Sequence, residues 1–377
     1  MFGFLSFYSI LLLFLAVDFC IIYGQNKRKP KERYFNFASI LLLLFATCRG
    51  ESVGGDLESY IPLFQNSADS SSFTEVFQTA LITGYEVGFV LLCKVISLFS
   101  HDSRWFIVVT SCISLFGPLF FINKYSNNKG LSLLLYLLLA FYNVSYNNIR
   151  QSVAISIVLI SVHFLINRKK TLFFLGIALA TTMHTSAVFT VFFFLFYRLR
   201  YSLSRAIGLI VGGGLTFVLL GSLLYQYILS NFFVKYLENG ESEMSGTGFG
   251  MLTVYLFVAL VCLFLFERVR NNFNDEEFLV EKILLYSVIF TVLIQAFATY
   301  MANITRLTYY FYILVIVLLP NILVNVKYVS TKRTLSAILF LLFYILACNT
   351  FLSPVEGLEK NSTDTIPYVF LNGLFSW

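Results

Sequence analysis

Long apolar runs recur from one end of the chain to the other, and they limit its fold more than any other feature. Of the 377 residues, 58% are hydrophobic and 12% are charged, whereas soluble domains carry about 25% charged residues. Because a backbone in lipid must satisfy its own hydrogen bonds, such runs form helices. The sequence therefore predicts an all-α polytopic membrane protein that forms one integral membrane domain, 1–377.

A crossing helix needs about 20 mostly apolar residues, and the runs supply about 12 transmembrane helices. The first run lacks a basic start, so we expect a retained helix rather than a cleaved signal peptide. The predicted spans lie near 2–23, 35–49, 105–122, 131–147, 149–167, 171–184, 186–200, 205–228, 250–267, 282–302, 305–326 and 334–352.

Clusters of Lys and Arg set the expected orientation, since they mark cytoplasmic loops. From residue 123 onward, strict alternation of the spans places every such cluster on one side. The apolar segment 84–100 would reverse the downstream half if it crossed the membrane, so we predict that it is a re-entrant or peripheral helix. The basic clusters are NKRKPKER, NRKK, RLRYSLSR, ERVR and VKYVSTKR.

The same orientation predicts an outer surface that is mainly acidic and polar. Its parts are the external loops 50–83 and 229–249 and the tail 353–377. The net charge of +6 is then explained by cytoplasmic loops, and we expect no nucleic acid partner. The partner implied directly is the lipid bilayer.

Arg150 is an unexpected charge in the phrase YNVSYNNIRQ, between two apolar segments and at an outer helix end. Asn147 and Gln151 lie at the same junction, and amides at membrane depth need partners or a water-filled cavity. A guanidinium offers a planar fork of donors that matches phosphate oxygens. Arg150 is therefore a candidate phosphate contact; the alternative is an arginine that snorkels to lipid headgroups.

His184 ends the helix that follows Arg150 through a tight basic loop. Two antiparallel helices of about 16 residues each rise roughly 24 Å, so the start of one and the end of the next return to one membrane level. Arg150 and His184 are therefore expected neighbours. A neutral histidine can accept a proton near pH 7; the alternative is a histidine that is satisfied by a helix-end carbonyl.

Further candidates lie in CRGESVGGDLESY, TGYEVG and NITRLTYY. In the first motif Arg49 and Asp56 form either a salt bridge or part of a catalytic site. An acid such as Glu86 is costly in lipid and is expected to face a polar cavity. Arg306 lies at another outer helix end, and the tyrosines after it form either an interfacial belt or a sugar platform.

Several familiar chemistries are missing from the sequence. It has no Gly-rich loop ending in Lys-Ser/Thr, no G-x-S-x-G, no H-E-x-x-H and no paired aspartates suited to a divalent metal. Its six cysteines show no spacing typical of zinc sites. We therefore expect no metal and no cofactor, and an enzyme of this kind would handle phosphate with arginine.

These motifs, in the order CRGESVGGDLESY, TGYEVGFVLLCKVI, YNNIRQSVAISIVLISVHFLI, LGIALATTMHTSAVFTVFFFLF and NITRLTYYFYIL, resemble the EpsG family of bacterial polysaccharide polymerases. The resemblance covers most of the chain. It implies a GT-C-like or Wzy-like helical bundle in the bacterial cytoplasmic membrane with an outward active site. It also implies a metal-independent membrane glycosyltransferase for capsule, exopolysaccharide or O-antigen synthesis.

The implied reaction moves a growing glycan from undecaprenyl diphosphate to a lipid-linked oligosaccharide repeat unit. Undecaprenyl-diphosphate-linked oligosaccharides are then donor and acceptor, and a chain-length regulator and a flippase belong to the same pathway. The implied catalytic residues are Arg150, His184, Arg306 and Asp56. The implied substrate-binding residues are Arg49, Tyr60, Glu86, Asn147, Gln151 and Tyr309.

Two other functions fit the same residues. A flippase or transporter of lipid-linked oligosaccharide would bind the same diphosphate without chemistry, and matching broken helices in two halves would favour it. An O-antigen ligase-like glycosyltransferase would use the same donor and another acceptor, and a large external loop with its own His/Arg set would favour it. The choice of base between His184 and Asp56 is open at this level.

Overall fold

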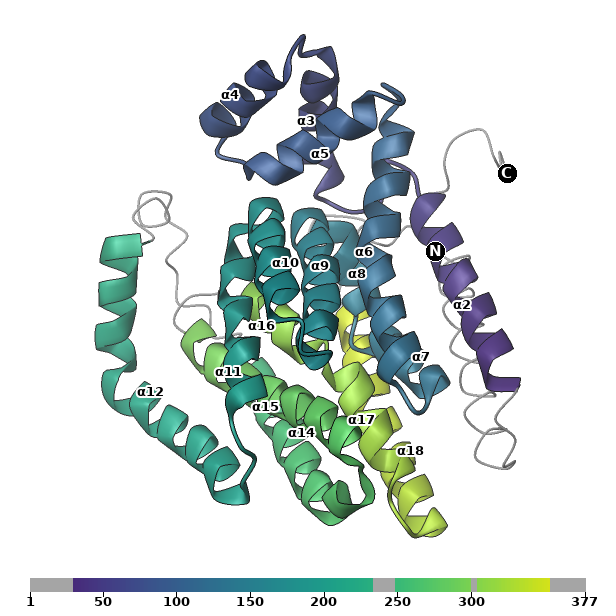
Figure 1. Cartoon of the computed structure of the whole chain (residues 1–377), viewed down its shortest axis with the longest axis vertical. Helices are drawn as coiled ribbons and strands as arrows, with labels where there is room; N and C mark the ends of the chain where they lie inside the picture. Colours follow the sequence, from purple (N-terminus) through teal and green to yellow (C-terminus); the bar gives the residue numbers. More distant parts are fainter. Residues whose placement is uncertain (1–29, 233–247, 300–303, 353–377) are drawn as a thin grey trace. The chain divides into compact units, whose positions relative to one another are not determined.

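The computed structural model describes residues 30–232, 248–299 and 304–352, and these residues fold into helices with no β-strand among them (Figure 1). The predicted all-α class is therefore confirmed. The first predicted span, 2–23, and the tail 353–377 lie outside the described residues. The chain divides into two compact units, Met1–Phe189 with Tyr328–Trp377 and Thr190–Lys327.

Five described helices are long and apolar enough to cross a membrane, and a bent pair brings the number to six. These helices make the chain a multi-pass membrane protein. The predicted count of about 12 is not confirmed, because segments such as 186–200 form short helices: a 3-10 helix, η1 (Thr185–Val191), followed by α11 (Phe192–Arg198). The long helices are Ser103–Tyr125, Ile149–Ile166, Phe249–Asn272, Thr305–Val324 and Ser330–Ala347.

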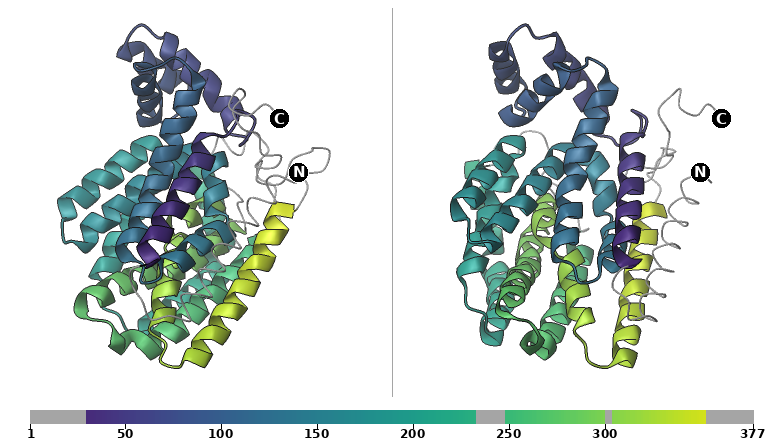
Figure 2. Two further views of the ribbon diagram at one scale, coloured as in Figure 1. Left: turned by 90° about the vertical axis from the view of Figure 1, so that its right-hand side faces the viewer. Right: turned by 45° about the vertical axis from the view of Figure 1, so that its right-hand side comes forward.

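The first unit is built on a layer of long helices with a cap of short ones. Helices α6, α9 and α10 run side by side, and α3, α4 and α5 gather beyond one end of them (Figures 1 and 2). The helices of this unit are α2 (Pro30–Thr47), α3 (Leu57–Asp69), α4 (Phe73–Thr83), α5 (Val87–Ser97), α6 (Ser103–Tyr125), α7 (Lys129–Leu138), α8 (Phe141–Asn147), α9 (Ile149–Ile166), α10 (Lys170–Met183) and α18 (Val329–Leu352).

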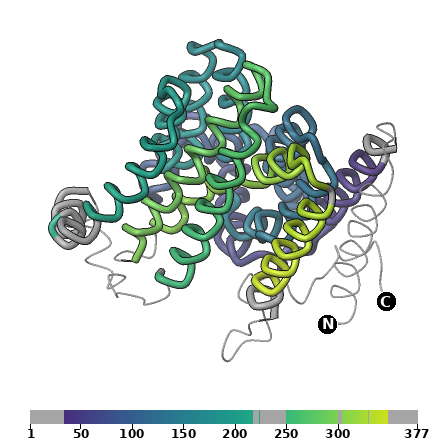
Figure 3. The backbone as a smooth tube through the Cα atoms, turned by 90° about the horizontal axis from the view of Figure 1, so that it is seen from below, coloured from purple at the N-terminus to yellow at the C-terminus, as the bar shows by residue number. Residues whose placement is uncertain are grey.

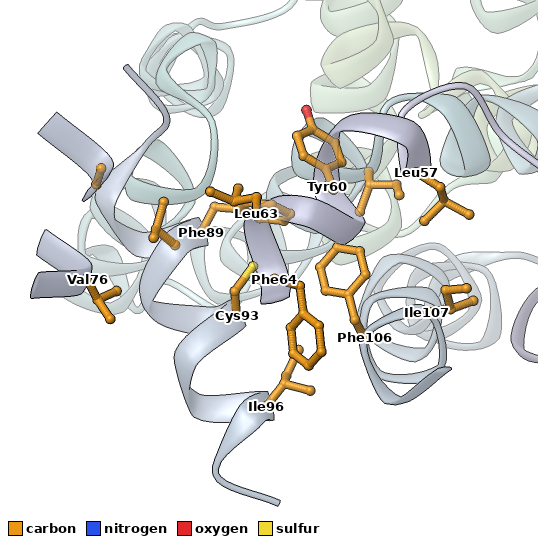
Figure 4. Packing of buried hydrophobic residues seen from close by; sticks show 13 residues of the cluster. Leu57, Tyr60, Leu63, Phe64, Val76, Phe89, Cys93, Ile96, Phe106 and Ile107 are labelled. Carbon is orange, nitrogen blue, oxygen red and sulfur yellow. The ribbon is translucent and has the colours of Figure 1, made fainter. Parts of the chain in front are cut away.

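Segment 50–83, which we expected as an external loop, is mostly helical because α3 and α4 each bury an apolar stripe. Their side chains pack with α5, the start of α6 and Ile149 around Phe64 and Phe89, both fully buried (Figure 4). Tyr60 belongs to this cluster, and its hydroxyl points away from the other members (Figure 4). The cap thus holds a polar group at the edge of an apolar core.

Helix α5 agrees with the prediction that 84–100 does not cross the membrane. Its 11 residues rise about 16 Å, which is short of the roughly 30 Å hydrocarbon core. The predicted span 131–147 is broken instead of continuous. Ala140 has a left-handed backbone, and α7 and α8 meet there at 50°.

Small side chains let α9 approach its neighbours closely, as membrane helices often do. A Cβ atom added to Gly117 of α6 would lie 2.4 Å from the Ser156 Cα atom, and one added to Gly176 of α10 would lie 2.1 Å from the Ser161 hydroxyl. The Gly117 amide also donates a 2.8 Å hydrogen bond to the Ser156 hydroxyl. These contacts fix the spacing of the helices that carry the site described below.

Replacing Gly117 with alanine is expected to destabilise the protein by about 1–3 kcal/mol, because the Cβ atom meets backbone that cannot move aside. Thermal unfolding in detergent measures the effect. Gly208→Ala is the matched control, since nothing lies within 4 Å of a Cβ atom there. Equal unfolding temperatures for the two variants would show that the close approach of α6 and α9 does not matter.

The second unit consists of helices packed around α15, with α14 running beside it (Figure 3, green). Asn321 donates a hydrogen bond to the buried carboxyl of Glu281, and Lys282 Nζ donates a 3.0 Å bond to the Tyr197 carbonyl. The bounds are α11 (Phe192–Arg198), α12 (Leu203–Phe232), α14 (Gly248–Val269), η2 (Arg270–Asn272), α15 (Asp275–Ala298), α16 (Thr305–Tyr312) and α17 (Val315–Val324).

Candidate active site

The loop before α3 is tied to the start of α9 by two reciprocal hydrogen bonds. The Asp56 carboxylate accepts from the Ile149 amide at 3.0 Å, and the Asn147 side-chain oxygen accepts from the Gly55 amide at 3.0 Å. Asp56 therefore satisfies one of the free amides at a helix start, the usual task of an N-cap. Gly54 allows the approach, because its φ is +106° and a Cβ atom would lie 2.5 Å from the Tyr146 carbonyl oxygen.

Arg150 follows directly and is held on several sides. Its Nη1 atom donates to Glu86 Oε2, and its Nε atom donates to the Tyr60 hydroxyl at 2.6 Å. The guanidinium carbon also lies 5.4 Å from the Tyr60 ring centre and 4.9 Å from that of Tyr85, within cation–π range. Burial and the charge of Asp56 raise the pKa of Tyr60, so its hydroxyl stays protonated.

The second oxygen of Glu86 binds the end of α10. Oε1 lies 2.9 Å from His184 Nδ1 and accepts from the Thr185 amide at 3.0 Å and from its hydroxyl at 3.3 Å. The three side chains remain partly exposed, so a ligand can reach them. The exposed fractions are 22% for Arg150, 13% for Glu86 and 21% for His184. One carboxylate thus connects the starts of α5 and α9 with the end of α10.

Glu86 is ionised at neutral pH. Burial alone would raise the pKa of its carboxyl, but the hydrogen bond with His184, the charge of Arg150 and the Thr185 amide together lower it from 4.5 to about 2. A carboxylate only accepts hydrogen bonds, so His184 Nδ1 carries the proton in this contact. When the ring is neutral, Nε2 is then the free acceptor, which is the tautomer that a general base requires.

Glu86 is expected to make stability depend on pH. Because its folded pKa of about 2 is below the ordinary 4.5, the carboxylate stabilises the fold fully above about pH 4.5, and this contribution is lost as the pH falls towards 2. The gap in unfolding midpoint between the wild type and Glu86→Gln should narrow as the pH falls from about 4.5 towards 2. A gap that is the same at about pH 3 as at pH 5 contradicts this charge state.

The other predicted residues are placed as follows. Arg49 is 1% exposed, and its guanidinium carbon lies 4.3 Å from the Tyr146 ring centre, which puts it next to the loop that Asn147 holds. Gln151 is buried on α9. Arg306, which is exposed, and the half-buried Tyr309 belong to α16 of the second unit.

Two site residues were missed by the sequence reasoning. Tyr85 lies against Arg150, and Thr185 donates twice to Glu86. Each directly adjoins a residue that was selected, Glu86 or His184, and this adjacency is the signal that could have found them. Within the described part of the chain, no group of three or more His, Cys, Asp or Glu side chains could hold a metal ion.

His163 behaves as a histidine with a local role. Its Nδ1 atom lies 2.7 Å from the Tyr125 hydroxyl, at the other end of α9 from Arg150.

Comparison with known proteins places the chain in a family. The sequence model of the EpsG family matches residues 32–370. The chain is also similar to amylovoran biosynthesis protein AmsC from Erwinia amylovora, with 29% identity over 196 residues. The alignment covers 51% of this chain and 52% of that relative, so the chain matches about half of the relative's length. No solved structure gives a significant match. Since the family match covers most of the sequence, this protein belongs to the EpsG family.

Proposed function

We propose that this protein is a polysaccharide polymerase that works on lipid-linked oligosaccharide repeat units at the outer face of the bacterial cytoplasmic membrane. Membership of the EpsG family and the similarity to a protein named for amylovoran biosynthesis support this function. The observation that carries the proposal is the joining of Arg150 and His184 through Glu86. A guanidinium for phosphate and a base for a hydroxyl are the two groups that such a transfer needs.

The proposed reaction breaks the bond between the first sugar of the growing glycan and the diphosphate of undecaprenyl diphosphate. The anomeric carbon forms a new bond to a hydroxyl of the incoming repeat unit, and undecaprenyl diphosphate leaves with the bonding electron pair. Negative charge therefore grows on the diphosphate. A preorganised arginine stabilises that charge more in the transition state than in the ground state, which is the condition for catalysis.

Arg150 is the proposed diphosphate contact. Two of its nitrogens are held by Tyr60 and Glu86, and its side chain is 22% exposed, so it is fixed and still reachable. Arg306 and Arg49 remain proposed further phosphate contacts, and Gln151 and Tyr309 proposed sugar or phosphate contacts. Arginine, instead of a metal ion, is proposed to balance the charge of the leaving group.

His184 is the better proposed base of the two that the sequence left open. The carboxylate of Asp56 accepts from the Ile149 amide and so caps α9. His184 in contrast presents Nε2 as an acceptor when Nδ1 donates to Glu86. In the proposed mechanism Nε2 takes the proton of the acceptor hydroxyl as the new glycosidic bond forms.

A test in the producing bacterium separates this function from its rivals. Loss of a polymerase leaves single repeat units at the outer face. Loss of a flippase leaves lipid-linked units at the inner face, and loss of a ligase leaves long chains on the lipid carrier. Deletion of the gene, followed by analysis of the length and membrane side of the lipid-linked glycans, is expected to give single outer-face units; either other pattern would reassign the protein.

A further inference from the structure

The guanidinium that is proposed to bind diphosphate is already engaged by an internal anion. Glu86 Oε2 accepts from Arg150 Nη1, while the Tyr60 hydroxyl takes the Nε donor and two aromatic rings lie within cation–π range. An arginine has five N–H donors, so these two contacts leave donors for a ligand. The Glu86 carboxylate still places one negative charge next to Arg150, where a bound diphosphate would add further negative charge.

We propose, on the basis of the function above, that Glu86 is a positioning residue with two opposite effects: it competes with the lipid diphosphate for Arg150, and it holds His184 in the tautomer that accepts the substrate proton. The carboxylate weakens diphosphate binding because like charges in a poorly hydrated site repel each other. It also speeds transfer because a fixed base and a fixed arginine need no rearrangement during the reaction.

The contacts of Glu86 distinguish this role from simple structural support. Its two oxygens divide between the two proposed reacting partners, Oε2 on Arg150 and Oε1 on His184 and Thr185. Asp56, the other acid near the site, contacts a backbone amide instead. Glu86 also begins α5 without capping it through its side chain, so its carboxylate serves the site and not its own helix.

If Glu86 both competes with diphosphate and orients His184, its removal should have opposite effects on binding and on reaction rate. Neutralising Glu86 should tighten diphosphate binding while it slows polymerisation. A residue that only supports the fold would weaken both, because a loosened site binds and reacts less well. The two readouts must therefore be measured on the same variant.

The test uses full-length protein in detergent, undecaprenyl diphosphate as the binding probe and glycan chain length in cells as the readout of transfer. Glu86→Ala removes the charge and both acceptor oxygens, and it is expected to bind the probe about tenfold more tightly, which corresponds to 1.4 kcal/mol, and to polymerise about 10- to 100-fold more slowly. Glu86→Gln removes the charge but keeps an oxygen that can accept from His184 Nδ1, so it should tighten binding similarly and slow polymerisation less. Glu75→Gln, an exposed change on α4 whose carboxylate accepts hydrogen bonds from the amide and the hydroxyl of Ser71, should match the wild type.

Unchanged or weaker probe binding in both Glu86 variants would overturn the proposed competition, and unchanged chain length in Glu86→Ala would overturn the proposed orientation of His184. Arg150→Ala, run in parallel, separates these failures from failure of the function itself. If Arg150→Ala loses probe binding and long chains while the Glu86 variants do not combine tighter binding with slower elongation, only the proposed role of Glu86 is wrong. If Arg150→Ala keeps both, the proposed function of the site is wrong.

Discussion

Cells that carry Arg150→Ala as their only copy of this protein are expected to display single repeat units in place of long glycan chains. The substitution removes the whole guanidinium, including the donors that Glu86 and Tyr60 leave for a ligand, and with them the proposed stabilisation of the leaving diphosphate. Loss of one such preorganised donor costs about 10²- to 10³-fold in rate. Gel analysis of surface glycan length, with immunoblotting for membrane insertion, measures the effect.

Arg150→Lys sharpens the same prediction, because lysine keeps the charge and loses the planar fork. It is expected to give short chains, between those of the wild type and the Ala variant. Arg104→Ala is the matched control: Arg104 lies at the start of α6 in an exposed ion pair with Asp102 and should leave chain length unchanged. Wild-type chains from stably inserted Arg150→Ala would contradict the role of this arginine.

His184→Gln is expected to lower the rate of chain elongation by about 10²- to 10⁴-fold, the usual contribution of a general base. Glutamine can still donate to Glu86, so the contact with the carboxylate is kept while the acceptor nitrogen is lost. His163→Gln, at the other end of α9 and next to Tyr125, is the control and should elongate normally. Pulse labelling of glycan in isolated membranes gives the rates.

Asp56→Asn decides between the two proposed bases. Asparagine keeps a side-chain oxygen that can accept from the Ile149 amide, so the cap on α9 survives. If His184 is the base, Asp56→Asn retains most of the activity. Abolished elongation in Asp56→Asn together with active His184→Gln would reverse the assignment.

The sequence was most informative where one long helix buries much of its surface. The predicted span 149–167 agrees with α9, Ile149–Ile166, and 105–122 lies within α6, Ser103–Tyr125. It was least informative where the backbone breaks inside an apolar run. Hydropathy is continuous across Leu139 and Ala140, so the 50° bend between α7 and α8 leaves no mark in composition.

The cap of short helices escaped prediction for a related reason. The segment 50–83 is polar enough to be predicted as a loop, but every third or fourth residue of α3 is buried, and this stripe is stabilised by packing against α5, α6 and Ile149. Such contacts join parts of the chain far apart in sequence. Helix length and polarity alone do not specify them.

For the site, the sequence identified most residues but not their connections. The length of the α9–α10 hairpin predicted that Arg150 and His184 lie at one level, and in the structure both contact Glu86. The contacts of Asp56 with Ile149 and of Asn147 with Gly55 span more than 90 residues of sequence. No local sequence pattern encodes such pairs. The contact with the Ile149 amide is nevertheless the reason to propose Asp56 as a cap of α9 and not as the base.

The most direct test of the central claim is reconstitution of the purified protein in liposomes that contain only lipid-diphosphate-linked repeat units, isolated from cells that lack the gene. We predict a ladder of longer glycans, with one undecaprenyl diphosphate released for each new glycosidic bond, and no ladder with Arg150→Ala. Repeat units that cross the bilayer without elongation, or a full ladder from the Arg150 variant, would contradict the account.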